Sequence, residues 1–139
     1  MGKKKLKKQI KKKNELEKLA KLKVEKNACF SFKNFDDTQG KKISELSPKL
    51  LEEIFSKLKH YSNMKTSEVF NEKFKEYGVW EEIPKNGFKR PEYIEEDALW
   101  SSMHIKGKEC LIFHREDNVF NLVFIDTEHE FYPSKKKHT

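Results

Sequence analysis

The sequence predicts an α+β fold: an N-terminal basic helix, then a strand, a helical hairpin and a three-stranded antiparallel meander. Three observations support this prediction. Apolar residues recur at helical spacing over residues 47–61, change to strand-like runs after residue 98, and are separated there by turn residues at 106–108 and 115–118. Eleven Phe, four Tyr and two Trp are enough for one modest core and too many for a chain that is disordered throughout.

Residues 1–26 are predicted to form a lysine-rich helix or arm. Leu6 and Ile10 lie four apart, and further leucines continue a narrow apolar stripe. Lysines dominate the first half of the arm and repel one another, so we expect about the first dozen residues to fray without a polyanion.

A short strand is expected at Phe30–Phe35, followed by turn residues at 36–40. The clearest element is a helix that begins at Ser47, which can cap it, with Pro48 in the first turn. Acidic residues come early in this helix and basic residues late, as the helix dipole favours. Its apolar face comprises Leu50, Leu51, Ile54, Phe55, Leu58 and Tyr61.

A second helix is predicted from Thr66 to Tyr77, ended by Gly78 and joined to the first by a short link. Residues 79–83 are expected to form a brief strand, and a charged loop then reaches about Asp97. Three strands follow, at 99–105, 110–114 and 119–126. The last is almost continuously apolar, which predicts a central position that is covered on both faces.

The charge is unevenly distributed along the chain. Residues 1–26 contain twelve Lys and three Glu, whereas residues 27–134 contain 15 basic and 20 acidic residues. The sequence thus divides into a basic arm (1–26), an α+β domain (27–134) and a basic tail (135–139). No apolar run is long enough to cross a membrane, and two isolated cysteines fit neither a disulfide scaffold nor a cysteine-based zinc site. We therefore expect a cytoplasmic protein with reduced thiols.

No Walker loop, dinucleotide turn, nucleophile elbow or paired-histidine zinc motif is present. Antiparallel geometry instead predicts a cluster of side chains at one edge of the meander, comprising His104, Lys106, Lys108, His129 and Tyr132. Imidazole, amine and phenol groups can position a ribose hydroxyl and stabilise charge on a phosphate. A solvated polar rim is the alternative interpretation.

The stretch from Gly107 to Asp126, followed by His129 and Tyr132, resembles the C-terminal hairpin of the RelE/ParE-type toxins of bacterial toxin–antitoxin systems. The shared pattern is a glycine turn, an apolar strand, an acidic turn, a long apolar strand, and then a basic or histidine residue and a tyrosine. The order of strand and helical hairpin upstream also suits that fold. The resemblance implies a metal-independent mRNA interferase that acts by attack of the ribose 2′-hydroxyl, often on the ribosome, and is inhibited by an antitoxin protein. Carried over by position, His129 takes the polar place after the last strand, Tyr132 is the late aromatic residue, and Lys106 and Lys108 stand near the basic positions.

Our leading hypothesis is a small protein that binds RNA or the ribosome, and in its most specific form a toxin-type endoribonuclease without a cofactor. Electrostatic attraction would come from lysines of the arm, namely Lys3, Lys4, Lys5, Lys7, Lys8, Lys11, Lys12 and Lys13. The alternative is a non-catalytic protein-interaction module whose basic arm only tethers or solubilises it. A metal-dependent hydrolase centred on Asp126, Glu128 and His129 ranks last, because no second histidine lies at ligand spacing.

Overall fold

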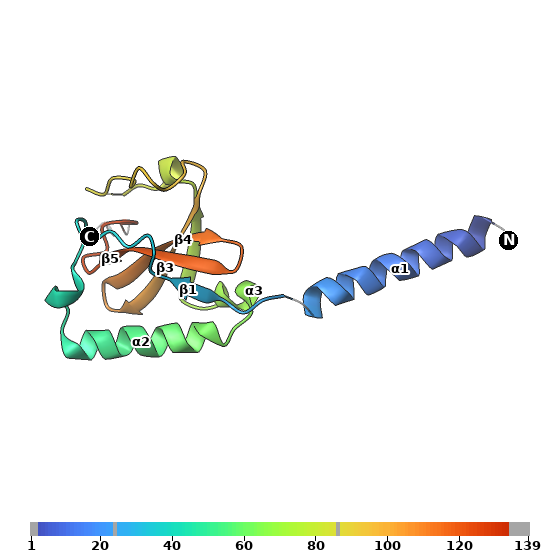
Figure 1. The fold of residues 1–139 in the computed structure, drawn as a ribbon, viewed down its shortest axis with the longest axis horizontal. Coiled ribbons are helices and arrows are strands. Elements are labelled where there is room, and N and C mark those ends of the chain that lie inside the picture. The colour runs from blue at the N-terminus through green and yellow to red at the C-terminus, as the bar shows by residue number, and fades with distance from the viewer. Residues whose placement is uncertain (1–2, 24, 86, 134–139) are drawn as a thin grey trace, which may run out of the picture.

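The computed structural model describes residues 3–23, 25–85 and 87–133. Figure 1 shows α2 below the sheet, the segment between β2 and β3 above it, and α1 extending away from both. The fold is α+β, as the sequence predicts. The elements are α1 (Lys3–Lys23), β1 (Cys29–Ser31), the 3-10 turn η1 (Ile43–Glu45), α2 (Pro48–Ser62), α3 (Thr66–Val69), β2 (Phe74–Gly78), the 3-10 turn η2 (Trp80–Glu82), β3 (Leu99–Lys106), β4 (Glu109–Glu116) and β5 (Val119–Asp126).

The five strands form one mixed sheet in the order β1-β5-β4-β3-β2. The predicted meander of β3, β4 and β5 is confirmed and antiparallel throughout. The sheet is larger than expected, because β1 pairs with β5 in parallel and β2 pairs with β3 in antiparallel orientation. β5 therefore lies between two strands, and seven of its eight residues are buried, as its apolar sequence predicts.

Both faces of the sheet are apolar, so each must be covered. On one face, α2 and its neighbours enclose a cluster that is rich in phenylalanine, with Phe74, Phe113 and Phe120 in mutual ring contact. On the other face, the segment between β2 and β3 and the residues after β5 enclose Trp100 and Phe124. The sheet is thus the middle layer between a helix and a set of aromatic loops. We call the buried cluster on the loop-covered face, which contains Trp100 and Phe124, the second layer.

The prediction for α2 is confirmed at its start, where Ser47 Oγ accepts a hydrogen bond from the backbone N–H of Leu50 at 3.1 Å. Pro48 occupies the first turn, where its missing N–H leaves no helical bond unmade. Ile54, Leu58 and Tyr61 are buried against the sheet. Phe55, which the periodicity places on that face, is instead 66% exposed.

The predicted second helix over Thr66–Tyr77 is wrong. Helix α3 ends after one turn at Val69, and Phe74–Gly78 is the edge strand β2. The spacing of the apolar residues in this segment does not distinguish a helix from a turn followed by a strand. Phe70 lies in the turn and Phe74 in the strand, yet both pack in the same core, with ring centroids 5.6 Å apart. Pairing with β3 supplies the hydrogen bonds that β2 needs, which outweighs the weak helical preference of a short segment.

Two smaller predictions also change. The strand expected at Phe30–Phe35 is only Cys29–Ser31, because a turn follows in which Phe35 N–H donates to the carbonyl of Phe32. The strand expected at residues 79–83 is the 3-10 turn η2. Helix α1 runs from Lys3 to Lys23, within the predicted lysine-rich helix or arm. The predicted basic tail at 135–139 lies outside the described residues.

His114 is buried inside the second layer, with 4% of its surface exposed. It lies on β4, opposite Trp100 of β3 and Asn121 of β5. Its Nε2 is 2.7 Å from Nδ2 of Asn34, an amide nitrogen that can donate to the unprotonated Nε2 of a neutral imidazole. Burial lowers the pKa of His114; Glu116 opposes this shift.

We expect the free energy of unfolding to decrease as the pH falls below about 6.5, the ordinary pKa of histidine. Below that pH the unfolded chain binds a proton on His114 that the folded chain excludes, so the stabilisation present at neutral pH is lost. Chemical unfolding between about pH 8 and about pH 5 measures this slope. His114→Gln should reduce the slope. An equal slope in the wild type and His114→Gln would contradict the assignment.

Candidate functional site

A pocket of about 600 Å³ lies where β2, β3 and the residues after β5 meet. We call it the tyrosine pocket. It brings together three of the predicted site residues, His104, His129 and Tyr132, with side chains that the sequence did not point to. Its lining comprises Glu72, Lys73, Lys75, Tyr77, Ser102, His104, Cys110, His129, Tyr132 and Pro133.

Two tyrosines stack on each other in the pocket. The rings of Tyr77 and Tyr132 stack with centroids 4.2 Å apart and planes only 8° from parallel. Tyr77 comes from the edge strand β2, and its Oη lies 2.5 Å from Oγ of Ser102 on β3. Burial raises the pKa of Tyr77, so its phenol stays protonated at neutral pH. Tyr132 is 40% exposed and offers an aromatic surface to a ligand.

Two histidines line the same pocket. Burial lowers the pKa of His104, and its neighbours Lys73, His129 and Lys57 lower it further, while Glu109 opposes them. His104 is therefore neutral near pH 7 and can accept a proton. His129 adopts a left-handed backbone conformation with φ of 57°, and its buried Nδ1 has no hydrogen-bond partner among the described residues.

The segment 127–133, which we call the C-terminal hook, carries His129 and Tyr132. The hook turns back over the sheet, and the carboxylate of Asp126 accepts hydrogen bonds from the backbone N–H groups of Glu130 and Phe131, at 3.1 and 2.9 Å. Phe131 is fully buried among the aromatic residues of the second layer. The segment that carries the two site residues is thus joined to the domain by a buried aromatic side chain and by a carboxylate.

Lys106 and Lys108 are predicted in this cluster but do not line the pocket. Lys106 turns toward α2, where its Nζ lies 3.5 Å from Oε1 of Glu53. Their place is taken by Lys73 and Lys75, which sequence analysis missed because the predicted second helix covers β2. The alternation Lys73, Lys75, Tyr77 around the buried Phe74 is the strand-like signal that could have identified them.

The metal-site alternative is not favoured by the geometry. Both carboxylate oxygens of Asp126 accept backbone hydrogen bonds, and the residue is 3% exposed. Glu128 lines a different hollow from His129, on the side of residues 38–41. No group of three or more candidate metal ligands occurs within residues 3–23, 25–85 and 87–133.

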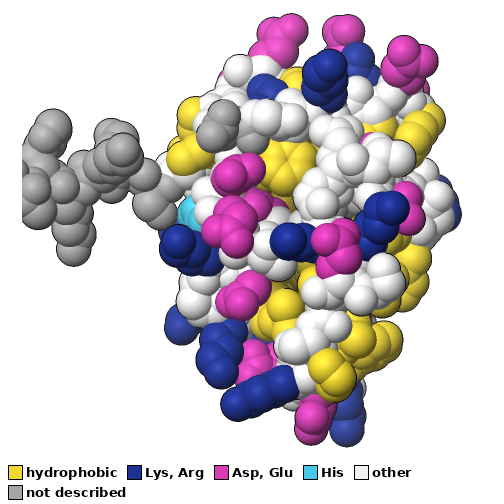
Figure 2. All heavy atoms as spheres, turned by 90° about the vertical axis from the view of Figure 1, so that its left-hand side faces the viewer, with side chains coloured by type: hydrophobic (Ala, Val, Ile, Leu, Met, Phe, Trp, Pro, Cys, Tyr) yellow, Lys and Arg dark blue, Asp and Glu magenta, His cyan; other side chains and the backbone are white. Residues whose placement is uncertain are grey.

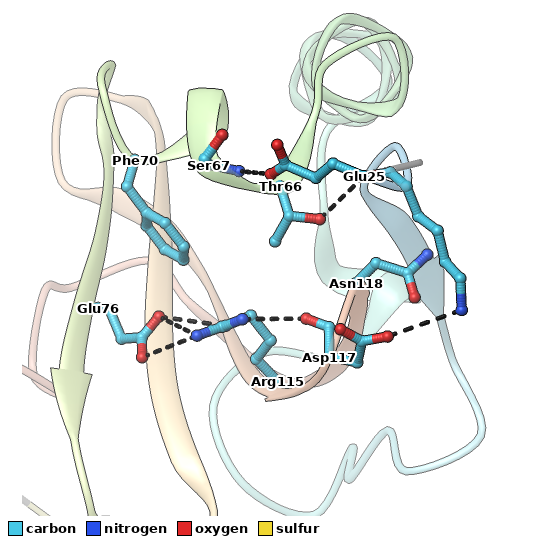
Figure 3. A pocket seen from close by; sticks show the side chains of 9 residues that line it. Glu25, Thr66, Ser67, Phe70, Glu76, Arg115, Asp117 and Asn118 are labelled. Carbon is cyan, nitrogen blue, oxygen red and sulfur yellow. Dashed lines mark hydrogen bonds and ion pairs between the residues drawn. The ribbon is translucent and has the colours of Figure 1, made fainter. Parts of the chain in front are cut away.

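A second pocket lies where the arm joins the domain (Figure 3). Oε1 of Glu25 accepts from the backbone N–H of Ser67 at 2.8 Å, which lowers the pKa of Glu25. Arg115 donates to both oxygens of Glu76 and to the carbonyl of Asp117. Because these charged groups already satisfy one another, this pocket anchors the start of the domain rather than presenting free ligands.

The face at the left of Figure 1 carries mixed charge. Figure 2 shows Lys and Arg side chains alternating there with Asp and Glu side chains, and one histidine beside basic side chains at its edge. Since residues 27–134 have an acidic balance, attraction of phosphate to the domain depends on local basic groups such as Lys73 and Lys75. The lysines Lys3–Lys13 are exposed along α1 and form a separate basic stretch.

Cys110 provides a test of the pocket's environment. Burial raises its pKa to about 11, with Asp126 contributing in the same direction. At about pH 8 only about one thiol in a thousand is then ionised. We expect iodoacetamide to modify the exposed Cys29 well before Cys110 in the folded protein, and both at similar rates in denaturant, as mass spectrometry would measure. Rapid modification of Cys110 in the folded protein would contradict this environment.

Within the part of the chain that the structure describes, no helix combines the length and apolarity that membrane crossing requires. No protein-family model, no curated protein and no solved structure matches this chain. The residues of the site are therefore the basis for a functional proposal.

Proposed function

We propose that this protein binds RNA, free or on the ribosome, through the tyrosine pocket and the lysines of α1. The observation that carries the proposal is the convergence of a stacked tyrosine pair, two histidines and two lysines in one pocket. An unpaired base stacks favourably on an exposed aromatic ring, and lysines neutralise the flanking phosphates. The pocket thus offers a complementary group to each part of a nucleotide.

The pair of histidines favours a specific reaction, metal-independent cleavage of the bound RNA. A neutral imidazole such as His104 removes the proton of a ribose 2′-hydroxyl, and the 2′-oxygen then attacks the adjacent phosphorus. The bond from phosphorus to the 5′-oxygen breaks, and a protonated group such as His129 returns a proton to that oxygen. The products are a 2′,3′-cyclic phosphate and a 5′-hydroxyl. Lys73 and Lys75 lie where they can stabilise the extra negative charge.

The pocket is tested by binding a fluorescent single-stranded RNA and measuring anisotropy. Tyr132→Ala should weaken binding by about fivefold to about 150-fold, because stacking contributes roughly 1–3 kcal/mol per base. Tyr93→Ala, at an exposed tyrosine outside the pocket, should bind as the wild type does. The same RNA, end-labelled, reports cleavage, which His104→Ala and His129→Ala should abolish with binding retained. RNA affinity that is equal in all variants would remove the pocket from the proposal.

The arm is tested through the dependence of RNA affinity on salt. Deleting residues 1–13 removes eight lysines and should leave thermal unfolding of the domain unchanged. The slope of log affinity against log salt should become shallower, by about 0.7 for each phosphate of a single strand that the arm no longer neutralises. An unchanged slope would show that α1 does not bind the RNA.

One observation favours the alternative of a non-catalytic protein-interaction module. Phe55 on α2 and Ile43 in η1 are more than half exposed, on a domain whose residues 27–134 are net acidic. Such a surface suits a basic protein partner with apolar side chains. In that case Phe55→Ser would abolish the interaction, and Tyr132→Ala would have no effect on it.

A further inference from the structure

We propose that Asp126 is a positioning residue, whose carboxylate holds the C-terminal hook so that His129 and Tyr132 face the tyrosine pocket. The role in RNA binding rests on the proposed function, but the positioning itself can be tested without RNA. Asp126 does not line the pocket, so it acts on His129 and Tyr132 through its hydrogen bonds to the backbone of the hook.

The sheet register places Asp126 beside the site. His104 on β3 lies opposite Cys110 on β4, and Cys110 lies opposite Asp126 on β5, so the three residues form one row across the sheet. Directly paired residues of antiparallel strands point to the same face. This row ends at the point where β5 stops and the hook begins. A carboxylate there can bond the chain as it turns back.

The geometry of the hook shows what the carboxylate adds. Phe131 fixes how deeply the hook inserts, because its ring is fully buried against Trp100 and Phe124. The burial of Phe131 does not fix the direction of the backbone on either side of it. The two hydrogen bonds from the backbone of Glu130 and Phe131 to Asp126 fix that direction. Both come directly after His129, whose backbone is left-handed. Hydrogen bonds to a charged acceptor are the stronger kind, so they can maintain that unfavourable conformation.

The experiment follows the imidazole protons of His104 by NMR as the pH is changed, in the wild type and in Asp126→Ala and Asp126→Asn. His104 reports on the hook because His129, together with Lys73 and Lys57, lowers its pKa, against the opposing effect of Glu109. Releasing His129 should therefore raise the pKa of His104 toward its ordinary value. Loss of the Asp126 charge alone would act in the opposite direction, because a nearby negative charge favours the protonated imidazole.

Asp126→Ala should give the larger rise, and Asp126→Asn a smaller one, because the amide keeps one acceptor oxygen. The matched control is Asp36→Ala, which removes another carboxylate that accepts a backbone N–H, from Thr38, outside the pocket. That variant should leave the pKa of His104 unchanged. If Asp126→Ala does not fold, the comparison of Asp126→Asn with the wild type decides the question. An unchanged or lowered pKa of His104 in the folded Asp126 variants would overturn the proposal.

The role in RNA binding is measured separately. Asp126→Ala should weaken binding of single-stranded RNA by about tenfold, while Asp36→Ala should not weaken it. If the wild type binds no RNA but the pKa of His104 rises in Asp126→Ala, the proposed function fails and the positioning role stands. If the wild type binds RNA and the pKa of His104 does not move, the proposed function stands and the positioning role fails.

Discussion

The structure depends on one constraint: the inner strands of the sheet are apolar on both faces and must be covered twice. β4 and β5 together contribute Leu111, Phe113 and Phe120 to one face and Ile112 and Phe124 to the other. A single amphipathic helix, α2, covers the first face. Among the described residues no second long helix packs on the sheet, and the other face is closed by aromatic loops, the last of which is the C-terminal hook. The tyrosine pocket therefore arises at the border of the second core layer, where the hook ends beside β2.

The elements with redundant signals were predictable from the sequence. α2 has a cap, a proline in its first turn and an apolar face, and all three indicate the same boundaries. The meander has turn residues between three strand-like runs. β2 was harder to predict, because its alternation extends over only five residues and its strand pairing depends on β3, more than twenty residues later. The spacing of Phe70, Phe74 and Tyr77 fits a helix equally well, and only the pairing partner decides.

The same error explains which part of the site could be found from the sequence. His104, His129 and Tyr132 converge because β3 and β5 flank β4 and run in the same direction, so both end at the same edge of the sheet, where the hook begins. Lys73, Lys75 and Tyr77 come from β2 and the residue before it, where the periodicity predicts a helix. Lys106 is close along the chain but is directed toward α2, beyond an irregularity in the register after His104. Proximity to the turn was therefore a poor guide to the direction of that side chain.

Strand β2 lies at one end of the sheet, so its outer edge presents backbone groups that another strand can pair with. Lysine side chains along such an edge oppose the approach of a second sheet, since pairing would bring like charges together. Lys73 and Lys75 are both exposed there, whereas the opposite end of the sheet is protected in part by the backbone bonds of residues 36 and 41 to β5. Lys73 and Lys75 are thus charges of the kind that disfavour the addition of another strand, and they belong both to the edge of the sheet and to the lining of the tyrosine pocket.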